Sequence, residues 1–214
     1  MMDDGPIGSM KQNDEDIAKT YIRNGIVNIL TGLKVYKGLD IEDENFKETP
    51  ERVATMIMNE KCVGINSVDK CKQILSKSFQ KTKKEKVDQM IIVANPSITY
   101  SLCPHHLENV EYKVWMGYMP KDRVVGLSKF DRVIKLYSKQ PILQEDFTTG
   151  LCDIVCDAIN PLGTIVIVKG RHDCMLSRGT ETYEKNQVVT SSLRGCFLED
   201  MTFKEEFMSL CSFE

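Results

Sequence analysis

The sequence predicts an α+β fold in which helices pack on one face of an antiparallel sheet, preceded by a helical N-terminal region. Up to residue 86, apolar side chains recur mainly at helical spacing. From residue 87 onwards, short β-branched or alternating segments indicate strands, and two further helices separate the early strands from the late ones. We therefore expect a disordered tail at 1–13, a helical region at 14–86 and an α+β domain at 87–214.

The composition argues against several classes of protein. The 214 residues carry a formal net charge of −3, whereas nucleic-acid-binding domains usually carry a strong basic excess. No apolar run approaches the ~20 residues that span a bilayer, and the N-terminus lacks the pattern of a secretion signal. The eight cysteines are irregularly spaced, which favours reduced thiols over disulfides. We expect a cytoplasmic protein that binds neither nucleic acid nor membrane.

Three helices are predicted in the N-terminal region. The first covers 14–31, and Gly32 is expected to end it. The second begins at Thr49-Pro50, because a hydroxyl N-cap followed by proline favours a helix start, and runs to about Glu60. A short helix is expected at 68–79. The basic run at 81–86 then marks a boundary, since blocks of like charge are usually solvated loops.

The remaining chain alternates between strand and helix patterns. The first two or three strands are expected to form an antiparallel meander. Ser128 is expected to cap a helix that ends before Pro141. The predicted elements are strands at 87–94, 97–102 and 110–119, a helix from 128, a helix at 144–159, strands at 164–169 and 187–193, and a helix at 202–210.

Two short stretches hold every histidine of the chain. A Cys-Pro-His-His stretch begins at Cys103, and a His-Asp-Cys stretch ends at Cys174. Cys103, His106 and a second thiol supply three ligands, and an open fourth position for water is the pattern of a catalytic zinc. His105 and His172 are then left beside the metal as proton-transfer groups. The alternative is that these cysteines are small buried apolar residues.

A second polar constellation surrounds a predicted helix start. Ser128, Lys129 and Arg132 combine a hydroxyl and two cations with the free N–H groups of a helix N-terminus, which favours anions. Arg178 follows the second cysteine stretch and is expected to join this phosphate site. A capped surface helix with exposed cations is the alternative.

Gln144 and Glu145 begin the helix at 144–159. A carboxylate at this position is stabilised by the helix dipole, which is its commonest role. The sharper hypothesis is a ligand carboxylate that accepts two N–H bonds from a planar group such as the guanine edge.

The ordered motifs of the chain resemble those of GTP cyclohydrolase I from about Glu48 to Phe207. The resemblance is carried by Tyr-Met-Pro-Lys-Asp at 118–122, Val-Gly-Leu-Ser-Lys at 125–129, Gln-Glu at 144–145, Arg-His-Asp-Cys-Met at 171–175, Val-Thr-Ser at 189–191 and Arg-Gly-Cys-Phe-Leu-Glu-Asp at 194–200. It implies a tunnelling fold whose subunits form a ring, usually a decamer, with active sites at subunit interfaces. It also implies hydrolysis of GTP to formate and 7,8-dihydroneopterin triphosphate, the entry to pteridine and folate synthesis.

The resemblance also implies roles for individual residues. It makes Cys103, His106 and Cys174 the zinc ligands, and His105 and His172 the acid/base pair. Ser128 is expected to assist proton transfer near the sugar. The residues expected to contact GTP are Gln144 and Glu145 at the guanine, Ser128, Lys129, Arg132 and Arg178 at the triphosphate, and Arg52 from a neighbouring subunit.

Two departures from the family pattern leave alternatives open. Pro104 replaces the glutamate of the family's Cys-Glu-His-His motif, which suggests a catalytically impaired, zinc-stabilised relative that binds nucleotide. Thr55 stands where many relatives carry a lysine, so another cation, from the run at 81–86, is expected to contact phosphate. A third hypothesis is a different tunnelling-fold enzyme that acts on another purine or pterin.

Overall fold

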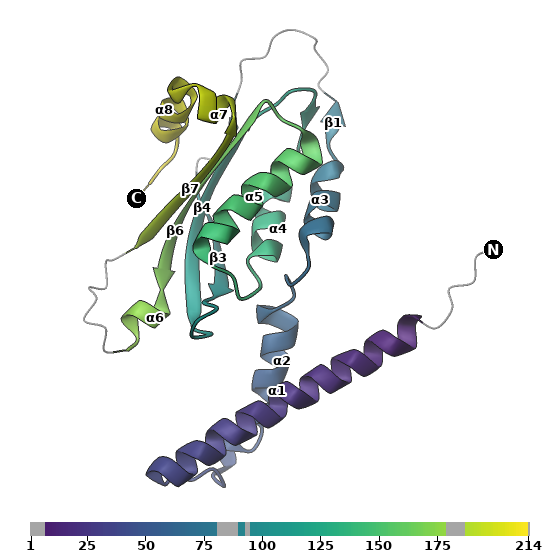
Figure 1. Cartoon of the computed structure of the whole chain (residues 1–214), viewed down its shortest axis with the longest axis vertical. Coiled ribbons are helices and arrows are strands. Elements are labelled where there is room, and N and C mark those ends of the chain that lie inside the picture. The colour runs from purple at the N-terminus through teal and green to yellow at the C-terminus, as the bar shows by residue number, and fades with distance from the viewer. Residues whose placement is uncertain (1–6, 81–89, 93–94, 179–186, 214) are drawn as a thin grey trace, which may run out of the picture. The chain divides into compact units, whose positions relative to one another are not determined.

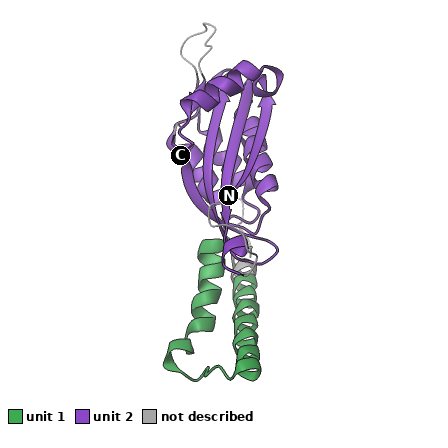
Figure 2. Cartoon of the chain, turned by 90° about the vertical axis from the view of Figure 1, so that its left-hand side faces the viewer, with its two compact units in different colours: residues 1–62 green, residues 63–214 purple. Residues whose placement is uncertain are grey.

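The computed structural model describes residues 7–80, 90–92, 95–178 and 187–213. It divides into two compact units, Met1–Cys62 and Val63–Glu214 (Figure 2). This division falls earlier than the boundary at residue 86 that composition suggests, and the functional limits of the domains stay a prediction. No helix in the described ranges is long and apolar enough to cross a membrane.

Unit 1 consists of helices. They are α1 (Ile7–Lys37), η1 (Glu44–Phe46), α2 (Thr49–Met56) and the π-helical turn η2 (Ile57–Lys61). The expected end of α1 at Gly32 is wrong, because α1 continues to Lys37. The disordered tail expected at 1–13 stays a prediction. Glycine lowers helix stability by about 1 kcal/mol but does not stop propagation. Gly38 ends the helix instead: it adopts a φ of 70° and donates its N–H to the Lys34 carbonyl.

Unit 2 is built on an antiparallel sheet. Its strands follow the order β2–β4–β6–β7, and β3 also pairs with β4. The expected meander forms only in part: β3 pairs antiparallel with β4, whereas the described residues of β2 pair with β4 and not with β3. Most of the expected strand at 87–94 lies outside the described residues. The strands are β2 (Ile91–Ile92), β3 (Ser97–Leu102), β4 (Asn109–Met119), β6 (Gly163–His172) and β7 (Val188–Gly195), with a separate pair β1 (Phe79–Gln80) and β5 (Arg123–Val124).

The helices of unit 2 are α3 (Val68–Ser76), α4 (Ser128–Tyr137), α5 (Gln144–Ile159), α6 (Asp173–Leu176), α7 (Cys196–Glu199) and α8 (Met201–Leu210). The prediction that Ser128 caps α4 is wrong. Leu127 precedes the helix with φ and ψ of −51° and −42°, and no side chain caps this end. Capping requires an extended residue before the helix, so Ser128 lies one position too late.

Helices cover both faces of the sheet, which corrects the expected packing on one face alone. Figure 1 shows α3, α4 and α5 on one side and α7 and α8 on the other. On β4, Val114 belongs to the core under α5, whereas the next residue, Trp115, belongs to the core around α8. Consecutive strand residues point to opposite faces. Because both are apolar and buried, the second face also needs a cover.

Candidate active site

The candidate site lies where three chain segments meet at one end of the sheet. These are the loop between β3 and β4, the first turn of α5, and the junction of β6 with α6. Together they surround a pocket of about 290 Å³. His172 ends β6 and is the register partner of Val110 on β4, so the sheet itself brings the two histidine-containing stretches together.

The β3–β4 loop is a closed turn. The Cys103 N–H donates to the Glu108 carbonyl over 2.8 Å, and the Leu107 N–H donates to the Cys103 carbonyl over 2.8 Å. Leu107 adopts a φ of 55°, a left-handed conformation that non-glycine residues rarely adopt. These bonds hold Cys103 and His106 within one tight turn.

Cys103, His106 and Cys174 converge as the sequence predicts. Their ligand atoms lie within 4.8 Å of one another. A tetrahedral zinc with bonds of ~2.0–2.3 Å places its ligands roughly 3.5–3.8 Å apart, so only a small contraction is needed. The Cys103 sulfur lies 3.8 Å from His106 Nδ1, and both sulfurs are buried. Two thiols and one imidazole form a donor set that suits zinc.

The other two histidines flank this group. His105 Nδ1 lies 3.9 Å from the Cys103 sulfur, and its ring is exposed. His172 is half-buried, and its ring meets Tyr112 edge to face at 6.4 Å. Burial lowers the pKa of His172, while the nearby charge of Glu145 raises it and partly offsets that effect. Both rings line the same pocket as the three candidate ligands.

Gln144 connects α5 to two strands and to His172. Its Oε1 lies 2.9 Å from His172 Nε2. Its Nε2 lies 3.2 Å from the Val168 carbonyl, 3.0 Å from the Val188 carbonyl and 3.1 Å from the Thr190 hydroxyl. The side chain is only 3% exposed. Its whole amide is therefore engaged within the protein.

The other predicted ligand-binding residues divide into two groups. Glu145 and Arg178 line the pocket, and the Arg178 Nε donates to the Cys174 carbonyl over 2.7 Å. Ser128, Lys129 and Arg132 do not line it; they lie at the start of α4, and Lys129 Nζ is 5.9 Å from the centre of the Phe79 ring.

Arg52, the remaining predicted contact, belongs to unit 1. It pairs with Glu48 over 2.7 Å, and both side chains are exposed. The basic run at 81–86, suggested as a substitute cation, lies outside the described residues.

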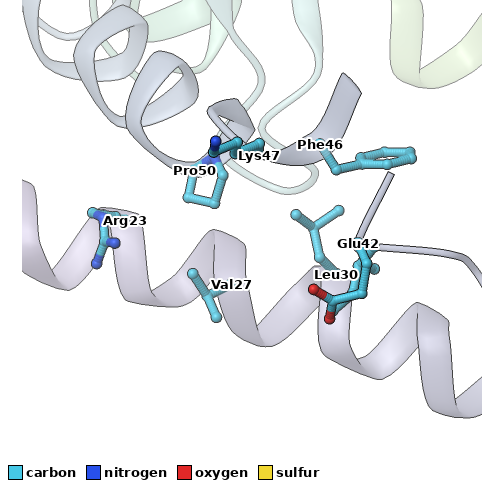
Figure 3. Close-up of a pocket in the computed structure, with 8 residues that line it drawn as sticks. Arg23, Val27, Leu30, Glu42, Phe46, Lys47 and Pro50 are labelled. Carbon is cyan, nitrogen blue, oxygen red and sulfur yellow. The ribbon is translucent and has the colours of Figure 1, made fainter. Parts of the chain in front are cut away.

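A larger hollow, of about 540 Å³, occurs in unit 1 between α1 and the η1–α2 segment (Figure 3). Its lining combines apolar side chains such as Leu30 and Phe46 with charged ones such as Arg23 and Glu42. It contains no cysteine or histidine. Size therefore does not identify the active site, whereas the chemistry of the smaller pocket does.

Comparison with known proteins decides the family. A model of the GTP cyclohydrolase I family matches residues 26–212. The chain belongs to the GTP cyclohydrolase I family. A protein of Clostridium perfringens named GTP cyclohydrolase 1 is 38% identical over 92% of this chain and 99% of its own length. Proteins of the same name from Caldanaerobacter subterraneus and Dehalococcoides mccartyi are 36% and 35% identical, over 91% and 88% of this chain and 97% and 94% of their own lengths.

One solved structure resembles the chain more distantly. Archaeosine synthase QueF-Like in the apo form has a TM-score of 0.42 and 22% identity, covering 51% of this chain and 97% of that chain. This likeness is too low to carry an argument about the GTP cyclohydrolase I site.

Sequence reasoning missed three residues that support the site. Thr148 and Thr190 bond to each other over 2.6 Å beside Gln144, and Gly170 leaves room for the Gln144 amide. Thr190 belongs to the Val-Thr-Ser motif of the GTP cyclohydrolase I family, which is the one signal that pointed to it. Thr148 follows Gln144 by four residues and therefore shares its helix face.

Proposed function

We propose that this GTP cyclohydrolase I hydrolyses GTP and rearranges its ring to give 7,8-dihydroneopterin triphosphate and formate, the first step of pteridine and folate synthesis. The observation that carries the proposal is the convergence of Cys103, His106 and Cys174 beside His172, within a chain of this family. A cytoplasmic location is part of the proposal, because all eight cysteines are free thiols.

Cys103, His106 and Cys174 are the proposed zinc ligands. When bound there, zinc supplies a Lewis acid that activates water for hydrolysis at neutral pH. Two buried sulfurs and one exposed imidazole leave one side of the ligand group open to the pocket. The substrate therefore has access to the metal position from the solvent side.

The remaining proposed roles belong to individual side chains. His172 is the proposed group that protonates guanine N7, which makes C8 easier to attack. His105 is exposed and is proposed to move protons near the sugar when the ribose opens, with Ser128. The exposed Glu145 carboxylate is proposed to accept two N–H bonds from the guanine edge, and Arg178 to contact phosphate. Holding the base and the phosphates at once fixes C8 near the catalytic groups.

We further propose that a second copy of the chain completes the site. Ser128, Lys129 and Arg132 lie at the N-terminal end of α4. Just beyond the C-terminal end of α4, Pro141 bridges Leu102, the residue that precedes Cys103. Ten helical residues extend ~15 Å, and none of these three residues lines the pocket of its own chain.

Ring assembly is proposed as the way in which that copy is placed. Within the described part of unit 2, β7 pairs on one side only, with β6, and β3 pairs with no strand other than β4, although Pro141 bridges its last residue, Leu102. Such open edges favour strand addition between copies. Arg52 is proposed to contact phosphate from a neighbouring subunit.

Pro104 supports the alternative function, a catalytically impaired relative that binds nucleotide. It is exposed on the pocket wall, where the family carries a glutamate. The proline does not prevent the three ligands from converging. Turnover therefore separates the two functions better than metal content does.

A single-turnover assay with GTP tests the proposal. We expect stoichiometric formate and, after oxidation, a fluorescent pterin, and we expect both to disappear on chelation and return with zinc. Tight GTP binding without formate would favour the impaired relative.

Mixing two inactive variants tests the shared site. Cys174→Ser and Lys129→Ala carry their lesions in opposite halves of the proposed interface. If the halves come from different copies, co-expressed chains regain part of the activity. If the mixture stays inactive although it assembles, the site is not shared.

A further inference from the structure

Both ends of the Gln144 side-chain amide are already hydrogen-bonded within the protein. Its amide oxygen lies against His172, and its amide nitrogen lies within 3.2 Å of three acceptor atoms. The side chain is 3% exposed, whereas the neighbouring Glu145 is exposed. Contact with guanine through its N–H₂ group would require Gln144 to break buried hydrogen bonds and leave polar groups unpaired inside the protein.

The orientation of this amide follows from its neighbours. Backbone carbonyls only accept hydrogen bonds, and those of Val168 and Val188 both face one end of the Gln144 amide. That end is therefore the N–H₂ group, and the oxygen faces His172 Nε2. Since the oxygen only accepts, His172 Nε2 carries a hydrogen, and the lone pair of the neutral ring lies on Nδ1.

Two hydroxyls close a circuit that begins and ends on Gln144. Thr148 Oγ1 donates to the main-chain carbonyl of Gln144 over 2.7 Å, so it accepts from the Thr190 hydroxyl at 2.6 Å. Thr190 Oγ1 is then free to accept from Gln144 Nε2 at 3.1 Å. Every bond in the circuit has one consistent direction. The circuit therefore holds the amide in the orientation that the carbonyls require.

We propose that Gln144 is a positioning residue for His172 rather than a guanine-binding residue. Its amide oxygen holds Nε2–H of His172, with Thr148 and Thr190 fixing the amide, and His172 exchanges protons with the substrate through Nδ1. Recognition of the guanine edge then falls to Glu145. This inference rests on the proposed function for the identity of the substrate, but the hydrogen-bonded state of His172 does not depend on it.

Ring-¹⁵N-histidine labelling of the full-length, metal-loaded protein tests the proposal by solid-state NMR. With three histidines in the chain, His172→Asn assigns the signals. We expect the His172 ring to carry hydrogen on Nε2, with that N–H bonded to the Gln144 amide oxygen. Gln144→Met should speed exchange of that hydrogen with solvent by about tenfold or more, the value of one hydrogen bond.

Gln140→Met is the matched control. Gln140 donates from its own amide to the Tyr137 carbonyl, away from His172, so this variant should leave the exchange rate unchanged. A His172 ring whose Nε2 carries no hydrogen in the unmodified protein, or unchanged exchange in Gln144→Met, would overturn the proposal.

Kinetics distinguish positioning from base recognition. Gln144→Met should lower kcat on the order of 10- to 100-fold, as is typical when an orienting partner is lost. The Kd for GTP should stay within about twofold. A large loss of GTP affinity with kcat retained would assign Gln144 to the guanine and overturn the proposal.

A second variant covers the case in which Gln144→Met does not fold. Gly170→Ala keeps Gln144 but displaces its oxygen, and should also speed exchange at His172; unchanged exchange would again overturn the positioning role. If the unmodified protein does not turn over GTP, the proposed function fails, whereas the exchange measurement still decides the role of Gln144.

Discussion

Gly170→Ala is the substitution whose consequence follows most directly from the geometry. A Cβ at residue 170 would lie 2.1 Å from Gln144 Oε1 and 3.1 Å from His172 Nε2. Real Cβ atoms essentially never approach a neighbour within 3.0 Å, so the amide oxygen must retreat by at least 0.9 Å, the difference between 3.0 and 2.1 Å. The four bonds of this amide are 2.9–3.2 Å long. A shift of that size takes at least one of them out of range.

The cost of Gly170→Ala lies in those hydrogen bonds rather than in the clash, because the end of a glutamine side chain moves easily once it is released. Losing one or two buried hydrogen bonds costs about 1–3 kcal/mol. For a chain of this size, each 1 kcal/mol lowers Tm by roughly 2–4 °C. We therefore expect a fall in Tm of about 2–12 °C, together with a fall in kcat, measured by thermal unfolding and by formate release.

Gly25→Ala is the control for this prediction. Nothing lies within 4 Å of a Cβ added at Gly25, which is inside α1. Replacing a helix glycine by alanine stabilises by about 0.8–1 kcal/mol, so Tm should not fall and kcat should be unchanged. If Gly170→Ala matches the unmodified protein in both Tm and kcat, the amide is not held as tightly as the distances indicate, and the reasoning fails.

Three further predictions concern the metal, the base and the core. Cys174→Ser should reduce the zinc content, measured by mass spectrometry, from about one ion per chain to almost none, because the two remaining ligands bind zinc weakly. Cys211→Ser is the control and should retain zinc. Equal loss of zinc in both variants would contradict the ligand assignment. Glu145→Gln should raise KM for GTP by roughly 10- to 100-fold through loss of a charged hydrogen-bonding pair. Asp146→Asn, its exposed neighbour, should leave KM unchanged, and equal effects would mean that general charge matters. Leu151→Ala should lower the free energy of unfolding, measured by urea denaturation, by about 2–5 kcal/mol, since the Leu151 side chain is fully buried on the inner face of α5. A loss below 1 kcal/mol would show that this core is loosely packed.

Elements with strong local signals were predictable at the residue level. The strand at 97–102 and the helix at 144–159 have the bounds that the sequence predicts. Alternation, helical periodicity and the breaks beside them act over a few residues, so they can be read locally. Single-residue signals are less reliable: Gly32 does not end α1, and Ser128 does not cap α4.

The second helical cover of the sheet was harder to predict. Apolar residues on both faces of β4 indicate two buried faces, but they do not show which segment covers the second one. That cover comes from the end of the chain: the Trp115 Nε1 donates to the Ser212 carbonyl over 2.9 Å, across a separation of 97 residues. No local pattern records a contact of this kind.

The sequence by itself predicts Cys103, His106 and Cys174 as a metal-ligand group, and the structure brings their ligand atoms within 4.8 Å of one another. It also placed Gln144 and Glu145 together as one candidate pair. Only the tertiary structure distinguishes their surroundings. Both residues line the pocket, but adjacent residues on a helix point about 100° apart: Glu145 is exposed, whereas the Gln144 amide is bonded to carbonyls from strands 24 and 44 residues further along the chain.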